Sequence, residues 1–332
     1  MSTHTKQMER NFAKRCLSNG GQIMPMLVDS SKTNGTGLCN PSIIIYPLSD
    51  TIVANIRHVG YDLHHSEEKI FQSWHGPLIY LHPENDVKLR TENYITYYDI
   101  NTLEEKSKPV KIKMLDLHKP IWTFIGLEDA RLTFWNNQLN FIGVRRDTTD
   151  NGVGRMEISV VKNNKEISRK RIEPPKEAYC EKNWMPIIDQ PNRFLKWTIP
   201  TEIVEVHGEK AETVILNETK IEHSEITRDI RGGSQVVPFG DGYLCITHEV
   251  DLWREENGHK DAQYYHRFFF FNKHFEIVDF TPEFKFMDFK IEFCCGLAIK
   301  DDQAYISFGA QDNAAYLLKV HTDVIKKFFR YA

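Results

Sequence analysis

The chain has 332 residues, of which 41% are hydrophobic and 12% aromatic, as is typical of a globular protein with a large core. The formal net charge of −4 excludes a protein that attracts nucleic acid through its overall charge, although a local basic groove is compatible with it. No segment resembles a secretory signal or reaches membrane-spanning length, and the six cysteines form no Cys-x-x-Cys pair, so we expect a cytoplasmic protein without membrane association.

The two ends of the chain differ from its middle. Residues 1–35 are predicted to form a polar N-terminal arm, with a short helix between Gln7 and Leu17. Residues 321–332 are predicted to form a C-terminal helix or tail, whose buried side would consist of Val324, Ile325, Phe328 and Phe329. Residues 36–320 contain short strand-and-turn units and no convincing amphipathic helix, so we expect one catalytic domain there.

Five strand–turn–strand units share one layout in this domain. They begin near Asn40, Glu128, Glu181, Arg231 and Cys295. Their turns contain Ser49-Asp50, Asn136-Asn137, Gln190-Pro191-Asn192, Gly240-Asp241-Gly242 and Asp301-Asp302. The numbering gives 17 residues from Asn40 to Arg57 and from Glu128 to Arg145, and 16 from Gly232 to His248 and from Gly296 to Asp312. Each unit has an apolar middle and polar or glycine-containing ends.

Such radial repetition predicts an all-β fold, a five-bladed β-propeller with short N- and C-terminal extensions. The two ends of every unit would then converge on one axial pocket. The spacing between units is uneven, and the long first gap must hold extra strands or an insertion, for which Trp74 to Tyr98 is the candidate. A β-sandwich with coincidental hairpins is the alternative.

The converging ends define the candidate site. It would contain Arg57, Glu128, Asp129, Arg131, Arg145, Arg146, Lys182, Asn183, Arg231, His248 and Asp312. Paired carboxylates serve as general acid or base because each tunes the pKa of the other. Arginine, lysine and histidine hold a phosphate or diphosphate through charge-assisted hydrogen bonds. Since neighbours on a strand point to opposite faces, only one of Arg145 and Arg146 should face the pocket.

Other motifs favour structural roles. Trp184 and Met185 are more typical of a core than of a sugar platform, and the Gly232-Gly233 pair usually marks a bend in a β protein. His64-His65, His266 and His274 lack a ligand pattern, so we expect no metal and no cofactor.

The chain resembles, at spaced motifs over residues 38–320, the five-bladed β-propeller enzymes of glycoside hydrolase family 130, the β-mannoside phosphorylases, and their mannosyltransferase relatives. Glu128-Asp129-Ala130-Arg131 is similar to the family's Glu-Asp-Pro-Arg segment, which implies that Asp129 is the catalytic acid. Lys182-Asn183 and His248 are similar to further family positions, and the resemblance implies that His248 contacts phosphate. Ser307 to Asp312 resembles the segment whose aspartate holds sugar hydroxyls. Arg57, Arg145 or Arg146 would then contact the anion.

Two departures from the family pattern affect the choice of donor. Ala130 replaces a proline, and the segment from Glu181 to Pro186 is not the phosphorylase version. We therefore predict a glycosyltransferase-type enzyme that moves a sugar from a nucleotide sugar or sugar phosphate to an acceptor hydroxyl, with Asp129 as general acid or base. Glu128 and Asp312 would orient hydroxyls, and Arg131 would fix the carboxylate.

The alternatives are an inverting β-mannoside phosphorylase that uses inorganic phosphate, and a non-catalytic glycan-binding propeller. The acceptor stays open between an oligosaccharide, a lipid-linked glycan and a modified nucleic acid, although a pI near 6.4 weakens the last. The sugar, the stereochemical outcome and the oligomeric state are also open.

Overall fold

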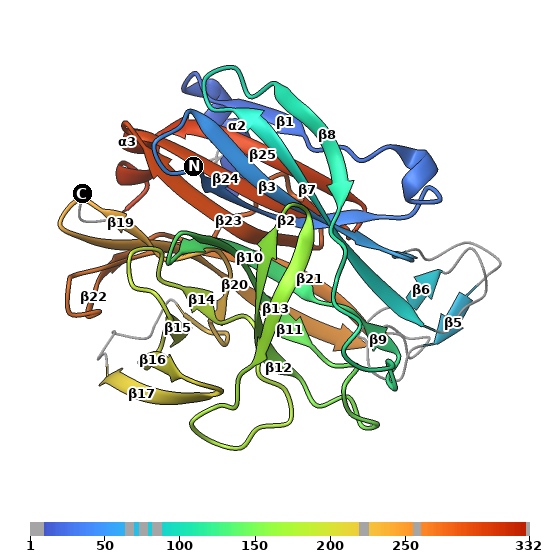
Figure 1. Ribbon diagram of the computed structural model, residues 1–332. Helices are drawn as coiled ribbons and strands as arrows, with labels where there is room; N and C mark the ends of the chain where they lie inside the picture. The colour runs from blue at the N-terminus through green and yellow to red at the C-terminus, as the bar shows by residue number, and fades with distance from the viewer. Residues whose placement is uncertain are drawn as a thin grey trace.

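The computed structural model describes residues 10–63, 70–72, 79–81, 88–218, 226–254 and 260–329. These residues form five antiparallel sheets arranged as the blades of a β-propeller, which confirms the predicted fold (Figure 1). The innermost strands lie around the axis, where β2 (Leu38–Ile45) contacts both β10 (Glu128–Trp135) and β23 (Glu292–Lys300).

Each blade is a meander of neighbouring strands. Blade one contains β2, β3 (Thr51–Val59), β7 (Leu89–Asp99) and β8 (Glu105–Lys111), with β9 (Phe124–Ile125) parallel to β7. Blade two contains β10, β11 (Gln138–Arg145), β12 (Arg155–Lys162) and β13 (Lys165–Arg171). Blade three contains β14 (Met185–Pro186), β15 (Arg193–Trp197), β16 (Thr201–His207) and β17 (Lys210–Asn217). Blade four contains β18 (Arg231–Gly232), β19 (Val237–Phe239), β20 (Gly242–Arg254), β21 (Lys260–Phe271) and β22 (Ile277–Phe280).

Blade five joins the two ends of the chain. It contains β23, β24 (Gln303–Ala310), β25 (Ala314–His321) and β1 (Gln22–Pro25). The register pairs Gln22 with Lys319, and in Figure 1 the blue β1 lies beside the red β25. The segment predicted as an N-terminal arm thus contributes a blade strand, while the position of the domain boundary stays a prediction.

Extra structure occupies the long first gap, as predicted. A small sheet of β4 (Asp62–Leu63), β5 (Ile70–Gln72) and β6 (Ile79–Leu81) lies between β3 and β7 in the chain. The predicted excursion was wrongly bounded, because its end at Tyr98 belongs to β7, a regular blade strand paired with β3. Its start at Trp74 lies outside the described residues.

Short helices flank the propeller. Helix α2 (Phe12–Ser18) begins at Asn11, whose side chain accepts a hydrogen bond from the Lys14 amide at 2.9 Å. Phe12 is buried against Phe268 and Phe284. A 3₁₀ turn covers Ser30–Lys32, and α3 (Thr322–Lys326) follows β25 directly. Val324, Ile325 and Phe328 are buried and Phe329 partly so, as predicted. Within the described residues, no helix is long and apolar enough to cross a membrane.

The hairpin turns follow from local sequence. Asn136 (φ 52°) and Asn137 (φ 59°) both adopt the left-handed backbone that a two-residue type I′ turn requires and that asparagine tolerates. Trp135 consequently pairs with Gln138, and the register continues to Arg131 and Ile142. Trp184 and Met185 are fully buried, which confirms that they belong to the core.

A single buried side chain links four blades at the axis. Gln235, in the loop before β19 of blade four, donates from Nε2 to Ser42 Oγ at 3.1 Å, to Ile43 O at 2.8 Å and to Leu132 O at 3.0 Å. Its Oε1 accepts from the Leu297 amide of blade five at 2.9 Å. Gln235 therefore joins blade four to blades one, two and five.

Replacing Gln235 with leucine is expected to lower the free energy of unfolding by about 3 kcal/mol or more, because it leaves buried carbonyls and a buried N–H without partners. Urea unfolding followed by circular dichroism measures this change. The matched control is Gln138→Leu, in which an exposed glutamine is replaced and stability should barely change. Equal stability of the two variants would contradict the role assigned to Gln235.

Candidate active site

Several residues at the strand ends near the axis have a left-handed backbone conformation. Asp129 has φ 49°, and it lies where the register between β10 and β11 shifts between Glu128 and Arg131. The same backbone region holds Asn40 (φ 42°), Asn183 (φ 62°) and Asp312 (φ 49°). Asparagine and aspartate tolerate this conformation better than other side chains, and such bulges redirect a side chain out of the regular pleat. The strand ends are thus bent so that polar groups converge, as predicted.

Asp129 accepts two short hydrogen bonds on one oxygen. Arg57 Nη1 and Asn40 Nδ2 each lie 2.7 Å from Asp129 Oδ1. Arg57 is itself held by Thr91, whose Oγ1 accepts from Nε at 3.2 Å and from Nη2 at 3.0 Å. Burial raises the pKa of Asp129, but the charges of Arg57 and Arg131 and the Asn40 hydrogen bond outweigh it, so the net pKa lies below the usual value. Asp129 is therefore ionised at neutral pH.

The pKa values of Glu128 and Asp312 are shifted upward, opposite to that of Asp129. Burial, followed by the charge of Asp129, raises the pKa of Glu128 against the opposing effect of Arg57. Burial and Asp129 likewise raise the pKa of Asp312, whose Oδ2 accepts a hydrogen bond from the Tyr61 hydroxyl at 3.1 Å. Three carboxylates thus share one electrostatic field with their pKa values pushed apart, a pattern typical of acid–base sites.

Arg131 donates a hydrogen bond to the main chain of Asp129. Its side chain is 1% exposed, with Nε donating to Gly233 O at 2.8 Å and Nη1 to Asp129 O at 2.7 Å. Its guanidinium also lies 3.4 Å from Asn183 Oδ1. Arg131 thus fixes the main chain of Asp129, whereas the sequence had suggested that it holds the carboxylate or a ligand.

His248 is a buried, neutral acceptor. Its Nδ1 lies 2.9 Å from Gly232 O, and because a carbonyl only accepts, Nδ1 carries the proton and Nε2 carries the lone pair. Burial, with His266 and Arg231 nearby, holds the pKa of His248 well below its usual range. Its ring stacks on Tyr264 with 5.7 Å between centroids. Burial and the Asp312 charge raise the pKa of Tyr264, so this tyrosine stays protonated as a donor.

Three cations lie at the cluster, where Lys182 and Arg146 act on the carboxylates and Arg231 acts on His248 and Tyr264. Lys182 is exposed, and its charge lowers the pKa values of Glu128 and Asp129. Arg231 pairs with His248 across β18 and β20. Among the described residues, the side chains of Lys182 and Arg231 find no hydrogen-bond or ion-pair partner. Arg146 also acts on Glu128, while its Nε donates to Gly152 O at 3.0 Å.

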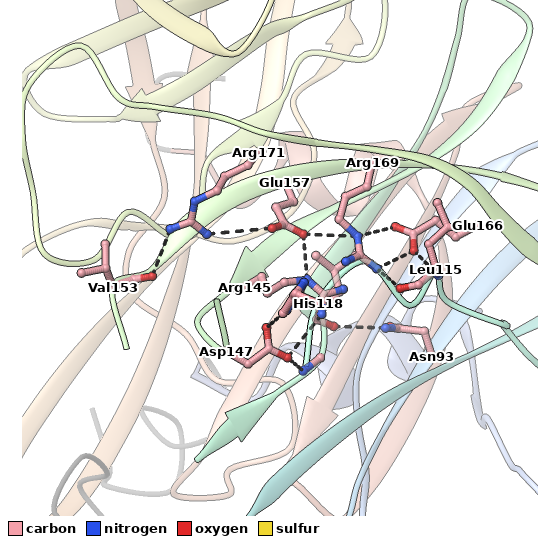
Figure 2. Close-up of polar contacts among 12 residues, drawn as sticks. Asn93, Leu115, His118, Arg145, Asp147, Val153, Glu157, Glu166, Arg169 and Arg171 are labelled. Atoms are coloured by element: carbon pink, nitrogen blue, oxygen red, sulfur yellow. Dashed lines mark hydrogen bonds and ion pairs between the residues drawn. The ribbon is translucent and has the colours of Figure 1, made fainter. Parts of the chain in front are cut away.

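Arg145 does not belong to this cluster, which corrects the prediction. Its side chain is buried in blade two, where Nε donates to Glu157 Oε2 at 2.7 Å and Nη1 lies 3.4 Å from Asp147 Oδ2 (Figure 2). Of the two neighbouring arginines, only Arg146 acts on Glu128, so its place at the site stays a prediction.

The sequence also left two contributors unassigned. Asn40 was recognised only as the start of a hairpin, and Tyr264 lies on the third strand of its blade. Neither carries a local signal, because Asn40 meets Asp129 across 89 residues of chain. Of the histidines considered for metal binding, His64 and His65 lie outside the described residues. In the described part of the chain, no three potential metal-ligating side chains gather.

The fold of this chain is similar to the folds of several solved structures. No protein-family model and no curated protein sequence matches the chain. A glycoside hydrolase family 130 structure, described as targeting β-1,2-mannosidic linkages in Candida mannan, has a TM-score of 0.57 and 12% identity, covering 87% of this chain and 85% of that one. The β-1,2-mannobiose phosphorylase from Listeria innocua has a TM-score of 0.54 and 12% identity, covering 88% and 92%.

A third match is the mannose phosphorylase MPT-4 from Leishmania mexicana, with a TM-score of 0.50, 14% identity, and 98% and 95% of the two chains covered. The chain is thus a five-bladed β-propeller with an axial cluster of carboxylates and cations. More specifically, its fold is similar to that of these mannoside-active enzymes, as the sequence motifs predicted. At such low identity the likeness defines the fold alone.

Proposed function

We propose that this protein is a glycosyl-transferring enzyme, in which Asp129 takes the proton of an acceptor hydroxyl while a sugar leaves an anionic donor. The observation that carries the proposal is the pair of 2.7 Å hydrogen bonds that Arg57 and Asn40 donate to Asp129 Oδ1, which favour its ionised form. Both bonds end on Oδ1, and no hydrogen bond to Oδ2 is found within the described parts of the chain, so Oδ2 would accept from a substrate. A general base must be ionised and within hydrogen-bond reach of the proton it removes.

The cations near the site would stabilise the negative charge of the leaving phosphate. As the acceptor oxygen forms its bond to the anomeric carbon, the bond from that carbon to the donor phosphate breaks, and the electron pair leaves with the phosphate. Lys182 and Arg231 have no competing partner among the described residues and would neutralise this charge. The acceptor proton ends on Asp129. His248 Nε2 and the Tyr264 hydroxyl are suited to accept from and donate to sugar hydroxyls.

Phosphorolysis of a β-mannoside is the second candidate. It needs a protonated carboxyl to donate to the leaving sugar oxygen, and the raised pKa values of Glu128 and Asp312 favour this form. Two proteins of similar fold are described as phosphorylases. In this version, phosphate would occupy the side of Lys182 and Arg231 as the attacking group.

Two reactions separate the candidates. The protein is incubated with a panel of nucleotide sugars and β-1,2-mannobiose as acceptor, and separately with β-1,2-mannobiose and inorganic phosphate. Acceptor-dependent release of nucleotide supports the transferase, whereas formation of a sugar 1-phosphate supports the phosphorylase. Thermal stabilisation by a glycan without either product would indicate a binding propeller and overturn both.

Replacing Lys182 with methionine is expected to raise the KM for the anionic donor about tenfold or more, because a charge-assisted contact is lost. The KM for the acceptor should change little. Lys162→Met provides the control, since Lys162 is exposed at the β12–β13 turn. An unchanged donor KM in Lys182→Met would remove Lys182 from the donor side.

A further inference from the structure

A second charged cluster lies inside blade two (Figure 2). Three arginines and three carboxylates balance one another in it: Arg145, Arg169, Arg171, Asp147, Glu157 and Glu166. Glu157 Oε2 accepts from Arg145 Nε at 2.7 Å, and Glu166 Oε1 accepts from Arg169 Nε at 2.8 Å. Because each arginine is paired with a carboxylate, the cluster has no excess positive charge with which to hold an anionic ligand.

Asp147 connects the cluster to the segment that carries the site. This residue is fully buried, and its Oδ2 accepts from the Gly126 amide at 2.9 Å and from Arg145 Nη1 at 3.4 Å. Its Oδ1 lies 3.2 Å from His118 Nε2. Gly126 stands two residues before Glu128, so the hydrogen bond from its amide fixes the chain where it enters β10.

The other side of Gly126 is equally constrained. Its φ of 103° is one that L side chains rarely adopt, and a Cβ added there would lie 2.4 Å from Thr91 O. Thr91 is also the residue whose hydroxyl holds Arg57, and Arg57 in turn holds Asp129. The chain at the start of β10 therefore lies between Asp147 and Thr91. Asp147 belongs to the charged cluster, and Thr91 holds the arginine that pairs with Asp129.

We propose that Asp147 is a positioning residue for the Glu128–Asp129 pair, and that Arg145 acts through it. Asp147 contacts no substrate; its carboxylate orients the Gly126 amide and so the turn from which both site carboxylates project. Arg145 compensates the charge of Asp147, since a buried carboxylate without a partner is costly. The effect on catalysis rests on the proposed function, whereas the effect on the segment does not.

Three variants test this role. Asp147→Ala removes the acceptor of the Gly126 amide, and Asp147→Asn keeps an oxygen that can accept it. Glu166→Ala is the matched control, because Glu166 is a buried carboxylate of the same cluster that bonds Arg169 and the Leu115 amide. Both alanine variants should lower the melting temperature.

Hydrogen exchange and titration then separate the variants. In Asp147→Ala, the amides of residues 126–130 should exchange at least about tenfold faster than in the wild type, whereas Glu166→Ala should leave them unchanged. NMR titration of the Glu128 carboxyl should shift in Asp147→Ala and not in Glu166→Ala. Asp147→Asn should restore most of the exchange protection. With a working donor, kcat should fall in Asp147→Ala with little change in KM.

The outcomes are distinct. Equal exchange and titration in the two alanine variants would overturn the proposal, because Asp147 would then stabilise the blade without positioning the site. Altered exchange with unchanged titration and kcat would also overturn it. If the wild type transfers no sugar from any donor, the proposed function fails, while exchange and titration still decide the role of Asp147.

Discussion

Asp129→Asn is expected to lower kcat by at least about a thousandfold, because an amide cannot take the acceptor proton and general-base contributions are of this order. The fold should survive, since asparagine tolerates the left-handed backbone of Asp129 and retains an oxygen for Arg57 and Asn40. Initial rates with saturating donor and acceptor measure the loss, and donor binding measured by calorimetry should persist.

The control for this substitution has the same chemistry and backbone. Asp301 has φ 49° in the exposed turn between β23 and β24. This turn is at the opposite end of the two strands from the candidate site. Asp301→Asn should leave kcat within about twofold of the wild type, as is usual for surface substitutions. If Asp129→Asn retains comparable activity, proton transfer must be assigned to another group, and Glu128 would be the first to test.

The repeated units were predictable because their signals are local. Asn136 and Asn137 specify a tight turn without help from the rest of the chain, and the alternating apolar residues beside them specify the strands. Once five such hairpins are placed radially, equivalent ends meet at the axis. In the structure Arg57, Glu128, Asp129 and Asp312 interact with one another at these ends.

The errors at the site have an equally physical cause. The offset from Glu128 to Arg145 suggested that the two residues lie opposite each other, but the bulge before Arg131 pairs Glu128 with Val144. Strand β11 itself continues without a shift to Arg145, which pairs with Arg155 of β12, and its side chain lies on the face that carries Glu157. Bulges depend on tertiary contacts, so their positions cannot be read from spacing.

The supporting role of Asp147 also could not be predicted from the spacing of residues in the sequence. It ends the hairpin that begins at Glu128, and the closeness of the two charged ends was visible in the sequence. The sequence suggested that both ends face a ligand. In the structure, one end binds the backbone of the other through the Gly126 amide. The assignment of Asp147 to support required its burial and the partners of Arg145, which are long-range properties.

Arg57→Met is expected to shift the pH dependence of activity, and the limb of the pH profile that moves separates the two candidate functions. The charge of Arg57 opposes the rise that burial imposes on the pKa of Asp129. Without it, the pKa of Asp129 should rise, because an adjacent opposite charge that favours the ionised carboxyl is lost. Activity that needs ionised Asp129 would then be lost at a higher pH than in the wild type.

The other limb shifts if Glu128 or Asp312 acts as the acid of phosphorolysis, because the charge of Arg57 also lowers the pKa values of both carboxyls. A higher pKa would keep the proton of that acid to higher pH, so the alkaline limb of the profile would move upward. Profiles of kcat/KM for the wild type and Arg57→Met measure this directly, with Arg193→Met as a control that removes an arginine from its 2.7 Å pair with Glu205 on blade three. An acid limb that moves upward only in Arg57→Met assigns Asp129 as the base of a glycosyl transfer. An alkaline limb that moves instead favours phosphorolysis, and no movement in either limb would show that Asp129 does not control the pH dependence.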